Sequence, residues 1–408
     1  MESFIDRSQY GNRKKVSIQH LLVKLIHRIL GSLDKNNKSE TYGAIIQLID
    51  WSQAYDRQCP LLAVQSFIDN GVRRSLIPLL TSYFQERKMY VKWKGYISKM
   101  RDLPGGGPQG CPLGQMSYIS QSNNNVTFVP NDDKFKWIDD LETLEIINLV
   151  TVGLSTYNFK NHVASDIGID QKFLSSKNIA SQEYMNKICQ WTDDHKMKLN
   201  EDKSKVMIVN FTKNFQFTTR IQMNTILEIV NQTKILGLIM TSDLTWRKNT
   251  ENIVSKANKR MIILVKLKKF PVPIKEMVML YCQFIRSILE FNSNVWYSSI
   301  TEEEAEDIER VQKNVCKLLL GQEYHSYEKS LSLLKLDNLK VRREKLAIKF
   351  GKSCLKLDDM KTLFEKSHES NYNLKRPEQY NVDFASGDRF FKSTIPSLQR
   401  LMNEKKFT

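Results

Sequence analysis

The feature that most constrains the fold is the stretch Lys136–Leu141, with sequence KWIDDL, in which two adjacent carboxylates interrupt an apolar region. Short apolar runs flank the pair on both sides, Phe135–Ile138 and Leu141–Ile147. This pattern predicts a strand, a tight turn and a second strand, with the aspartates at the tip of a hairpin. Successive strand residues point to opposite faces, so only one of the two carboxylates aims squarely at a common point. A solvated turn also accounts for such a pair taken alone.

Asp50 is the best candidate for a further carboxylate, because it ends the apolar run Ala44–Ile49, which predicts another strand. Two strand ends brought side by side would place Asp50, Asp139 and Asp140 around two divalent cations about 4 Å apart, as in-line phosphoryl transfer requires. Carboxylate oxygens select Mg²⁺ or Mn²⁺ over zinc. The sequence therefore predicts a site for two Mg²⁺ or Mn²⁺ ions.

Three further features fit the same chemistry, and each has a plainer alternative. Tyr55 lies five residues after Asp50, where its ring would lie under the sugar of a nucleotide and clash with a 2′-hydroxyl; ordinary packing is the alternative. Glycines and prolines in Leu103–Gly114 exclude a continuous helix and admit a ligand close to the backbone, although a simple turn has the same composition. Lys203, ahead of the predicted strand 206–211, is a candidate acid for departing pyrophosphate; a surface lysine is the alternative.

The charge balance favours a polyanionic partner. The chain has 408 residues, enough for two or three domains, and 61 Lys and Arg against 45 Asp and Glu give a net charge of +16. Such an excess favours nucleic acid. A predicted helix between Trp246 and Phe270 has an apolar stripe, eight basic residues and one acidic residue. Lys256, Lys259 and Arg260 in it are candidate phosphate contacts, with a merely solvated face as the alternative.

Several classes of protein are disfavoured by the sequence. The six cysteines have no CxxC spacing and the six histidines are scattered, so neither zinc nor a disulfide framework is predicted and reduced, intracellular thiols are the default. No apolar run approaches the roughly 18 residues of a membrane span. The N-terminus lacks the apolar segment of a secretory signal, and no targeting signal is readable.

One further local pattern predicts structure. Alternating apolar and basic residues in Tyr90–Ile97 predict a strand or hairpin.

These motifs together resemble the reverse transcriptase domain of non-LTR (LINE-type) retrotransposons. Asp50–Asp56 resembles that family's D-x-S-x-A-F-D, and Gly107–Gly114 resembles its G-x-P-Q-G-S-x-L-G. Trp137–Asp140 stands at its [FY]-x-D-D, and Leu199–Lys205 resembles its L-N-x-x-K-[ST]-x. Order and spacing agree from about Gln9 to Arg343, most of the chain.

The sequence departs from the family pattern at three points. Trp137 replaces the usual Phe or Tyr, and Cys111 stands where Ser or Thr is common. The family's fingers continue upstream of Gln9, with the basic residues that hold the triphosphate, and such elements also carry an endonuclease domain. The resemblance therefore predicts that Met1 begins in mid-domain and that the copy is truncated in the fingers.

The resemblance implies an α+β right-hand polymerase, with a palm of antiparallel strands that has helices on one face and an all-helical thumb. The implied domains are partial fingers at 1–43, palm at 44–245, helical thumb and C-terminal extension at 246–357, and a less regular tail at 358–408. The implied reaction is RNA-directed DNA synthesis on an RNA template, with a DNA primer and dNTPs, in the nucleus, without membrane or zinc.

The resemblance also implies roles for individual residues. Asp50, Asp139 and Asp140 would be the metal ligands, Tyr55 the steric gate and Lys203 the acid. Template and nucleotide would be contacted by Gly107, Pro108, Gln109 and Gly110. Two alternatives remain: an inactive nucleic-acid-binding remnant of such a protein, and an RNA-dependent RNA polymerase, against which Tyr55 argues.

Overall fold

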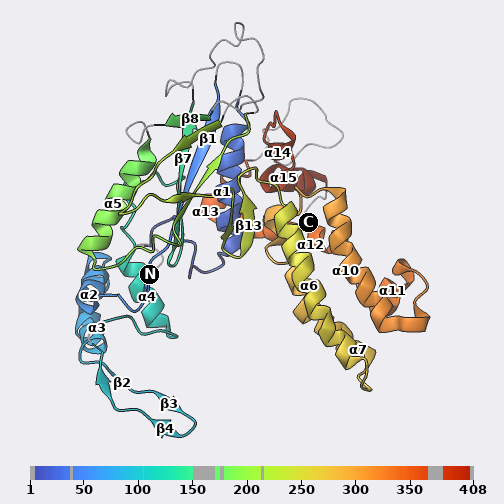
Figure 1. The fold of residues 1–408 in the computed structure, drawn as a ribbon, viewed down its shortest axis with the longest axis horizontal. Helices are drawn as coiled ribbons and strands as arrows, with labels where there is room; N and C mark the ends of the chain where they lie inside the picture. The colour runs from blue at the N-terminus through green and yellow to red at the C-terminus, as the bar shows by residue number, and fades with distance from the viewer. Residues whose placement is uncertain are drawn as a thin grey trace. The chain divides into compact units, whose positions relative to one another are not determined.

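A computed structural model describes residues 5–36, 40–103, 105–149, 171–174, 179–212, 216–365 and 380–404. The chain divides into two compact units (Figure 1). Unit 1 comprises Met1–Leu21 and Asn36–Val230, and unit 2 comprises Leu22–Lys35 and Asn231–Thr408. Each unit is described by itself below.

Unit 1 is built on a five-stranded sheet in the order β11-β9-β1-β7-β6. The central strand β1 (Tyr42–Ile49) pairs antiparallel with both β7 (Asp140–Asn148) and β9 (Lys205–Val209). On the far side of β7, β6 (Lys134–Trp137) completes the predicted hairpin, while the short β11 (Glu228–Ile229) runs parallel to β9. The run of apolar residues in β1 is almost wholly buried, and since successive side chains point to opposite faces, the sheet is covered on both faces at this strand. A separate parallel pair joins β8 (Gln171–Leu174) to β10 (Gln216–Thr219).

Helix α5 (Ala180–Asp194) is fastened to this sheet by its first turn. The Glu145 carboxylate on β7 accepts hydrogen bonds from the backbone N–H groups of Ala180 and Ser181, at 2.8 and 2.7 Å. The Gln47 side chain on β1 donates to the carbonyl oxygen of Ser181 at 2.8 Å. A carboxylate at a helix N-terminus satisfies free N–H groups and complements the helix dipole, so this contact sets where α5 begins.

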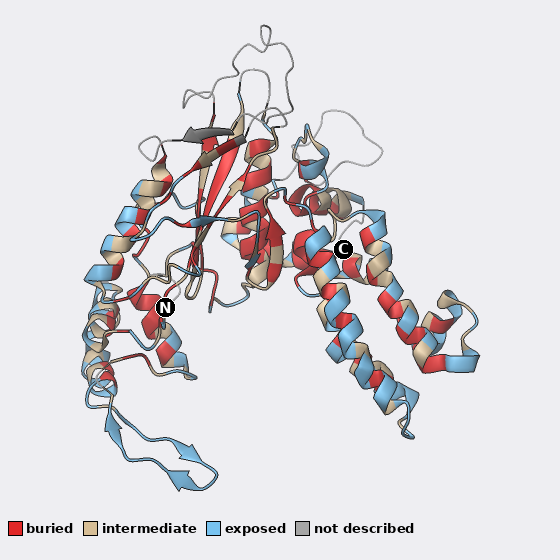
Figure 2. Ribbon diagram, in the orientation of Figure 1, coloured by how far each residue is buried: buried red, intermediate tan, exposed pale blue. Residues whose placement is uncertain are grey.

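A smaller helical group leads out of β1 and carries a hairpin. Helices α2 (Pro60–Asp69), α3 (Ile77–Phe84) and α4 (Pro112–Gln121), with the short η2 (Arg74–Leu76), enclose a small core around Phe67, Leu80 and Phe84. Between α3 and α4 the chain extends into paired strands, namely β2 (Lys88–Met89) with β5 (Arg101–Asp102) and β3 (Lys92–Trp93) with β4 (Tyr96–Ile97). This confirms the predicted hairpin, which is exposed along its whole length (Figure 2).

Unit 2 is mainly helical. Its one strand pair among the described residues joins β12 (Gln232–Ile235) to β13 (Leu238–Thr241). The helices that follow are α6 (Arg247–Leu267), α7 (Ile274–Leu280), the π-helical η5 (Tyr281–Arg286), α8 (Ser287–Leu289), α9 (Ser293–Trp296), α10 (Glu302–Leu320), η6 (Gly321–Glu323), α11 (Tyr327–Leu334), α12 (Leu339–Cys354), α13 (Asp358–Lys361), α14 (Asp388–Phe391) and α15 (Thr394–Glu404). Thr301 and Glu304 form a capping box at the start of α10.

From Leu22 onward, helix α1 (Ile18–Leu33) belongs to unit 2 and packs there on a segment from the other end of the chain. Asp34, just after α1, accepts hydrogen bonds from the backbone N–H groups of Ser386 and Gly387 at 2.7 and 2.8 Å. The His27 ring lies 5.4 Å from the Phe390 ring, centroid to centroid. The end of α1 therefore contacts residues that lie more than 350 positions later in the sequence.

The predicted α+β class is confirmed, as are the antiparallel pairing of β1, β6, β7 and β9 and the helical character of the region after Trp246. By its contacts the β12–β13 hairpin groups with the helices of unit 2 rather than with the sheet of unit 1. The predicted tail contains the regular helix α15, and residues 366–379 and 405–408 of it lie outside the described residues. The domain boundaries drawn by function remain predictions. No helix in the described ranges is both long and apolar enough to cross a membrane.

Candidate active site

Strand register brings the predicted carboxylates to one end of the sheet in unit 1. Ile49, the last residue of β1, pairs with Leu141 of β7. In an antiparallel pair the residue after Ile49 lies opposite the residue before Leu141, so Asp50 lies beside Asp140. The hairpin turn between β6 and β7 adds Asp139 at the same end. The three carboxylates come from segments about 90 residues apart in the sequence, so pairing of the two strands is what joins them.

The turn that presents Asp139 contains a strained residue, Ile138. Trp137 pairs with Asp140, which leaves only Ile138 and Asp139 to make the turn, and Ile138 has a φ of 62°. A β-branched residue rarely adopts this left-handed conformation. The surrounding structure must therefore hold it in place.

A segment near the N-terminus supplies that support. The Gln9 side-chain oxygen accepts hydrogen bonds from the backbone N–H groups of Ile138 and Gly11, at 3.0 and 2.9 Å. A Cβ on Gly11 would lie 2.6 Å from the Ile138 side chain, so only glycine fits there. Backbone bonds of 2.8 and 2.9 Å join Tyr10 and Ser8 to Lys136 along the outer edge of β6. This role of Gln9 could not be predicted from the sequence, because the residues around it have no periodic pattern.

Lys203 is placed beside Asp50 by a short network around the end of β1. The backbone N–H of Asn200 donates to the carbonyl oxygen of Asp50 at 2.8 Å, and the backbone N–H of Asp50 donates to the Ser204 hydroxyl at 3.1 Å. Ser52 and Lys198 are joined in the same way at 2.8 Å. The Lys203 ammonium lies 3.7 Å from Asp50 Oδ2 and is largely exposed. The predicted acid therefore stands next to the predicted carboxylate site.

The carboxylates repel one another electrostatically. Burial, followed by the charges of Asp139 and Asp50, raises the pKa of Asp140 to about 6. Burial is also the main reason why the pKa of Asp139 is raised, with Asp50 adding to it and Lys203 opposing it. Asp50 Oδ2 is buried and has no hydrogen-bond partner. Buried, mutually repelling carboxylate oxygens suit a hard divalent cation.

The side chains do not form a ready coordination cage as they lie. Among the residues that the structure describes, no group of three or more His, Cys, Asp or Glu side chains is close enough to hold a metal ion. The backbone positions of Asp50, Asp139 and Asp140 therefore lie together, and their charges affect one another's pKa values. Their role as metal ligands remains a prediction.

Tyr55 lies close enough to Asp139 to be affected by its charge, and it is also a packing residue. Its ring stacks on that of the buried Tyr118, with centroids 5.1 Å apart and planes inclined by 29°. Burial raises the pKa of the Tyr55 hydroxyl, and the charge of Asp139 raises it further. The two interpretations of Tyr55 are thus compatible, since the ring packs on Tyr118 while the charge of Asp139 acts on its hydroxyl.

The glycine-rich loop folds back onto the segment that follows Asp50. Backbone N–H groups of Gly106 and Gly107 donate to the carbonyl oxygens of Gln58 and Tyr55, at 2.8 and 2.5 Å. Gln109 donates from its side chain to the Asp56 carboxylate at 2.7 Å. The structure therefore brings the loop together with Tyr55.

At two positions of this region the backbone conformation or the lack of space requires glycine. Gly110 has a φ of 77°, which favours glycine. At Gly114 a Cβ would lie 1.7 Å from the carbonyl oxygen of Pro108. The close approach of the loop to the start of α4 thus depends on a missing side chain.

Known proteins support the resemblance inferred from the motifs. No family model matches the chain. The RNA-directed DNA polymerase from mobile element jockey of Drosophila melanogaster is 24% identical over 258 residues, which are 61% of this chain and 25% of that protein. The corresponding protein of Drosophila funebris is 25% identical over 254 residues, with the same two shares. This chain is similar to the RNA-directed DNA polymerases of mobile elements.

The predicted resemblance to retrotransposon reverse transcriptases is therefore confirmed. The chain spans about a quarter of the length of the curated relatives it matches. Among solved structures it is similar to apo telomerase from Candida tropicalis, with a TM-score of 0.38, 14% identity, and coverage of 81% of this chain and 50% of that one. Telomerase from Candida albicans in complex with a fragment of telomeric RNA gives a TM-score of 0.36, 10% identity, and coverage of 83% and 55%.

The predicted phosphate contacts lie on α6 in unit 2, apart in sequence from the carboxylate segments. Lys256, Lys259 and Arg260 are all exposed. Arg260 donates to the carbonyl oxygen of Phe284 at 3.0 Å, which holds its guanidinium against the following helical segment. Contact of these residues with nucleic acid remains a prediction.

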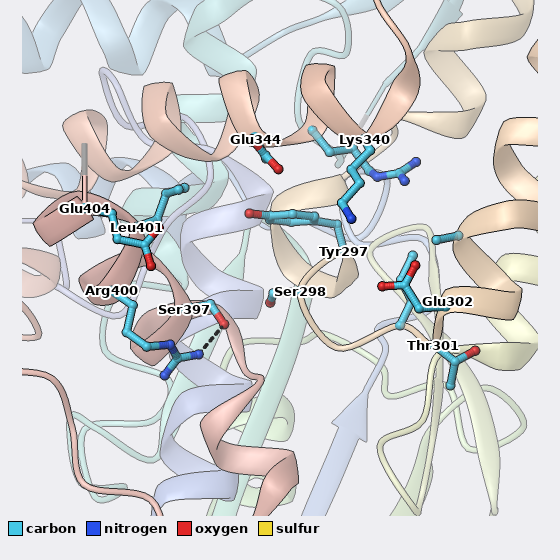
Figure 3. Close-up of a pocket in the computed structure, with 13 residues that line it drawn as sticks. Tyr297, Ser298, Thr301, Glu302, Lys340, Glu344, Ser397, Arg400, Leu401 and Glu404 are labelled. Atoms are coloured by element: carbon cyan, nitrogen blue, oxygen red, sulfur yellow. Dashed lines mark hydrogen bonds between the residues drawn. The ribbon is translucent and has the colours of Figure 1, made fainter. Parts of the chain in front are cut away.

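Unit 2 also has a hollow of about 320 Å³ (Figure 3). It is lined by residues that follow α9, by the first turns of α10 and α12, and by α15 from Ser397 to Glu404. Three basic and three acidic side chains line it: Lys340, Arg343, Arg400, Glu302, Glu344 and Glu404. Arg400 donates to the Ser397 hydroxyl at 3.1 Å. Because the formal charges balance, this hollow selects neither an anion nor a cation.

Proposed function

We propose that the chain is an RNA-directed DNA polymerase that extends a DNA primer on an RNA template with dNTPs. The primer 3′-oxygen would attack the α-phosphate of the nucleotide, and pyrophosphate would leave. The observation that carries the proposal is the β1–β7 register, which sets Asp50 beside Asp140 and the Asp139 turn. The loop of Lys203 is bonded to the same strand end.

The sheet of unit 1 would then be the polymerase palm, and the helices that begin with α6 would form the thumb. The similarity to mobile-element polymerases supports this assignment. As for retrotransposon polymerases generally, the nucleus would be the place of action.

Asp50, Asp139 and Asp140 would hold two Mg²⁺ or Mn²⁺ ions, which when bound would activate the primer hydroxyl and neutralise charge on the phosphates. The protein's own contribution would be to hold the oxygens at one point. Gln9 would keep the Ile138–Asp139 turn in its strained conformation, and the Asn200 and Ser204 bonds would fix the end of β1.

The remaining residues would orient the substrates and move one proton. Lys203, 3.7 Å from Asp50 Oδ2, would protonate the departing pyrophosphate. Tyr55 would exclude a ribose 2′-hydroxyl. The backbone of Gly107, Pro108, Gln109 and Gly110 would lie against template and nucleotide, since these residues fold over the Tyr55 segment.

Primer extension on a defined RNA template tests this function. The chain is incubated with a labelled DNA primer annealed to RNA, the four dNTPs and either Mg²⁺ or EDTA. We expect Mg²⁺-dependent elongation, seen as a ladder on a denaturing gel. Salt-sensitive RNA binding without incorporation would instead identify an inactive nucleic-acid-binding remnant, and equal use of rNTPs would identify an RNA polymerase.

The Tyr55→Ala variant is expected to lose discrimination against ribonucleotides. Removing the ring opens space where a 2′-hydroxyl would otherwise clash, so the dNTP-to-rNTP ratio of kcat/KM should fall about 10- to 100-fold. Single-nucleotide incorporation with dCTP and rCTP measures it.

Tyr55→Phe is the matched control, because it keeps the ring and the stacking on Tyr118. It should retain the discrimination of the wild type. Thermal melting separates lost packing from lost selectivity. If a folded Tyr55→Ala protein discriminates as well as the wild type, Tyr55 is not the gate.

A further inference from the structure

The hairpin between α3 and α4 is a two-stranded arm that stands free of any core. Two short antiparallel ladders form the arm. In β2 and β5, Lys88 pairs with Asp102 and Met89 with Arg101; in β3 and β4, Lys92 pairs with Ile97 and Trp93 with Tyr96. Lys94 and Gly95 form the tip, with φ of 46° and 88°, the two positive values of a tight type I′ turn. Every residue from 88 to 102 is exposed (Figure 2).

The composition of this arm is unusual for an exposed hairpin. Trp93 is 67% exposed, Tyr96 82% and Tyr90 52%. Trp93 and Tyr96 are direct cross-strand partners, so their side chains lie on the same face. A two-stranded hairpin without a core is marginally stable in water, and grouped exposed apolar residues mark interaction sites. The fold itself does not account for these rings.

The charge of the arm indicates what would cover it. Residues 88–102 contain five basic residues and one acidic residue, and the one acid, Asp102, lies 3.8 Å from Lys88. The Lys94 ammonium lies 5.9 Å from the centre of the Trp93 ring. Basic groups beside exposed aromatic rings are the arrangement that binds an unpaired nucleic-acid strand, whose phosphates pair with the lysines and whose bases stack on the rings.

We propose that the hairpin Lys88–Asp102 is a binding arm for single-stranded nucleic acid, with Trp93 and Tyr96 as its stacking platform. Lys94, whose ammonium lies beside the Trp93 ring, contacts a phosphate next to the stacked bases. This inference deepens the proposed polymerase function, on which it rests for the source of the strand, an unpaired stretch of template. Binding itself needs neither nucleotide nor synthesis.

The test is a binding titration of the full chain with fluorescein-labelled 20-mers of one sequence, as single-stranded RNA, single-stranded DNA and duplex, without dNTPs. The double variant Trp93→Ala/Tyr96→Ala should bind the single strands at least about tenfold more weakly. Its affinity for the duplex should change by less than about threefold, because paired bases cannot stack on the rings.

Two controls separate stacking from general damage. Trp93→Phe/Tyr96→Phe keeps two rings and should bind within about threefold of the wild type. Phe384→Ala removes an aromatic ring that is 88% exposed elsewhere in the chain, and should change nothing. Lys94→Gln should lower the slope of log K against log salt by about 0.7 on single strands, whereas the aromatic variant keeps the wild-type slope.

The inference is overturned if the double alanine variant, folded by circular dichroism, binds single strands as tightly as the wild type. It is also overturned if duplex binding falls by the same factor, or if the variant changes only self-association measured by sedimentation. Failure of primer extension with the predicted binding differences intact would count against the polymerase function alone. Normal extension with no binding difference would count against the arm alone.

Discussion

Asp139→Asn and Asp140→Asn are each expected to slow primer extension at least about 10³-fold. Each substitution removes one carboxylate charge from the sheet end where Asp50, Asp139 and Asp140 converge. A lost metal ligand removes several kcal/mol of transition-state stabilisation, and about 4 kcal/mol corresponds to a thousandfold in rate. Single-turnover incorporation of one dNTP measures the loss.

The Asp140→Asn substitution should not lower thermal stability although it slows primer extension. Measuring both properties therefore separates a loss of catalysis from a loss of folding. Burial and the neighbouring carboxylates raise the pKa of Asp140 to about 6, so its charge at pH 7 opposes folding. An amide of the same shape removes that repulsion. We therefore expect a melting temperature no lower than that of the wild type.

The control for this pair is Asp132→Asn, which changes an exposed carboxylate in the turn just before β6. It should extend primers at the wild-type rate. Binding of single-stranded RNA should survive in all three variants, since the arm at 88–102 is a separate feature. A folded Asp140→Asn protein that extends primers at near the wild-type rate would show that the carboxylates have another role.

Asp6→Ala is expected to lower the free energy of unfolding of the chain by about 3 kcal/mol. The Asp6 carboxylate lies 3.1 Å from the ammonium of Lys134 and 3.6 Å from that of Lys136, and both lysines are buried. Removing one partner of a buried ion pair leaves a buried charge uncompensated, which costs about 3–5 kcal/mol. Lys136 keeps hydrogen bonds to the Ser122 carbonyl oxygen and the Asn125 side chain, at 2.8 and 3.1 Å, so we place the loss at the lower end.

This stabilisation should depend on pH in a defined direction. Burial raises the pKa of Asp6, but Lys136, the backbone N–H of Ser8 and Lys134 lower it more, so the net shift is downward. A carboxyl whose pKa is lower in the folded state stabilises the protein above its unfolded pKa of about 3.9, and this contribution is lost as the pH falls through the folded value. The gap between wild type and Asp6→Ala should be complete at pH 7 and narrow below about pH 4.

Urea unfolding at pH 7, 5 and 3.5 measures the gap. Asp102→Ala is the comparison, because it breaks an ion pair in which Asp102 is 84% exposed. It should change the unfolding free energy by less than about 0.5 kcal/mol. A gap that is absent at pH 7, or that widens in acid, would contradict the assignment of Asp6 as the partner of the two lysines.

Local pattern was enough to predict the elements that carry the candidate site. The apolar run before Asp50 and the two runs around Asp139 and Asp140 are strands β1, β6 and β7. Alternating or continuous apolar residues indicate which side chains of a strand are buried. Strands next to turns can therefore be predicted from the order of the residues.

Contacts between distant segments could not be predicted in this way. Nothing near Gln9 indicates that its side chain holds the Ile138 turn, 129 positions away. Asp6 likewise has no local sign of its buried lysine partners. The docking of the glycine loop on the Tyr55 segment also depends on where α2, α3 and α4 direct the chain.

The sequence alone was enough to predict the strands that carry the candidate site and the carboxylates at their ends. It was also enough to show the resemblance to retrotransposon polymerases. Only the tertiary structure decided the β1–β7 register, the support of a strained turn by Gln9, and the exposure of Trp93 and Tyr96 on a free arm. The physical reason is that backbone pairing and burial involve residues far apart in the chain. Their energies depend on which surfaces meet, and residue order alone does not specify that.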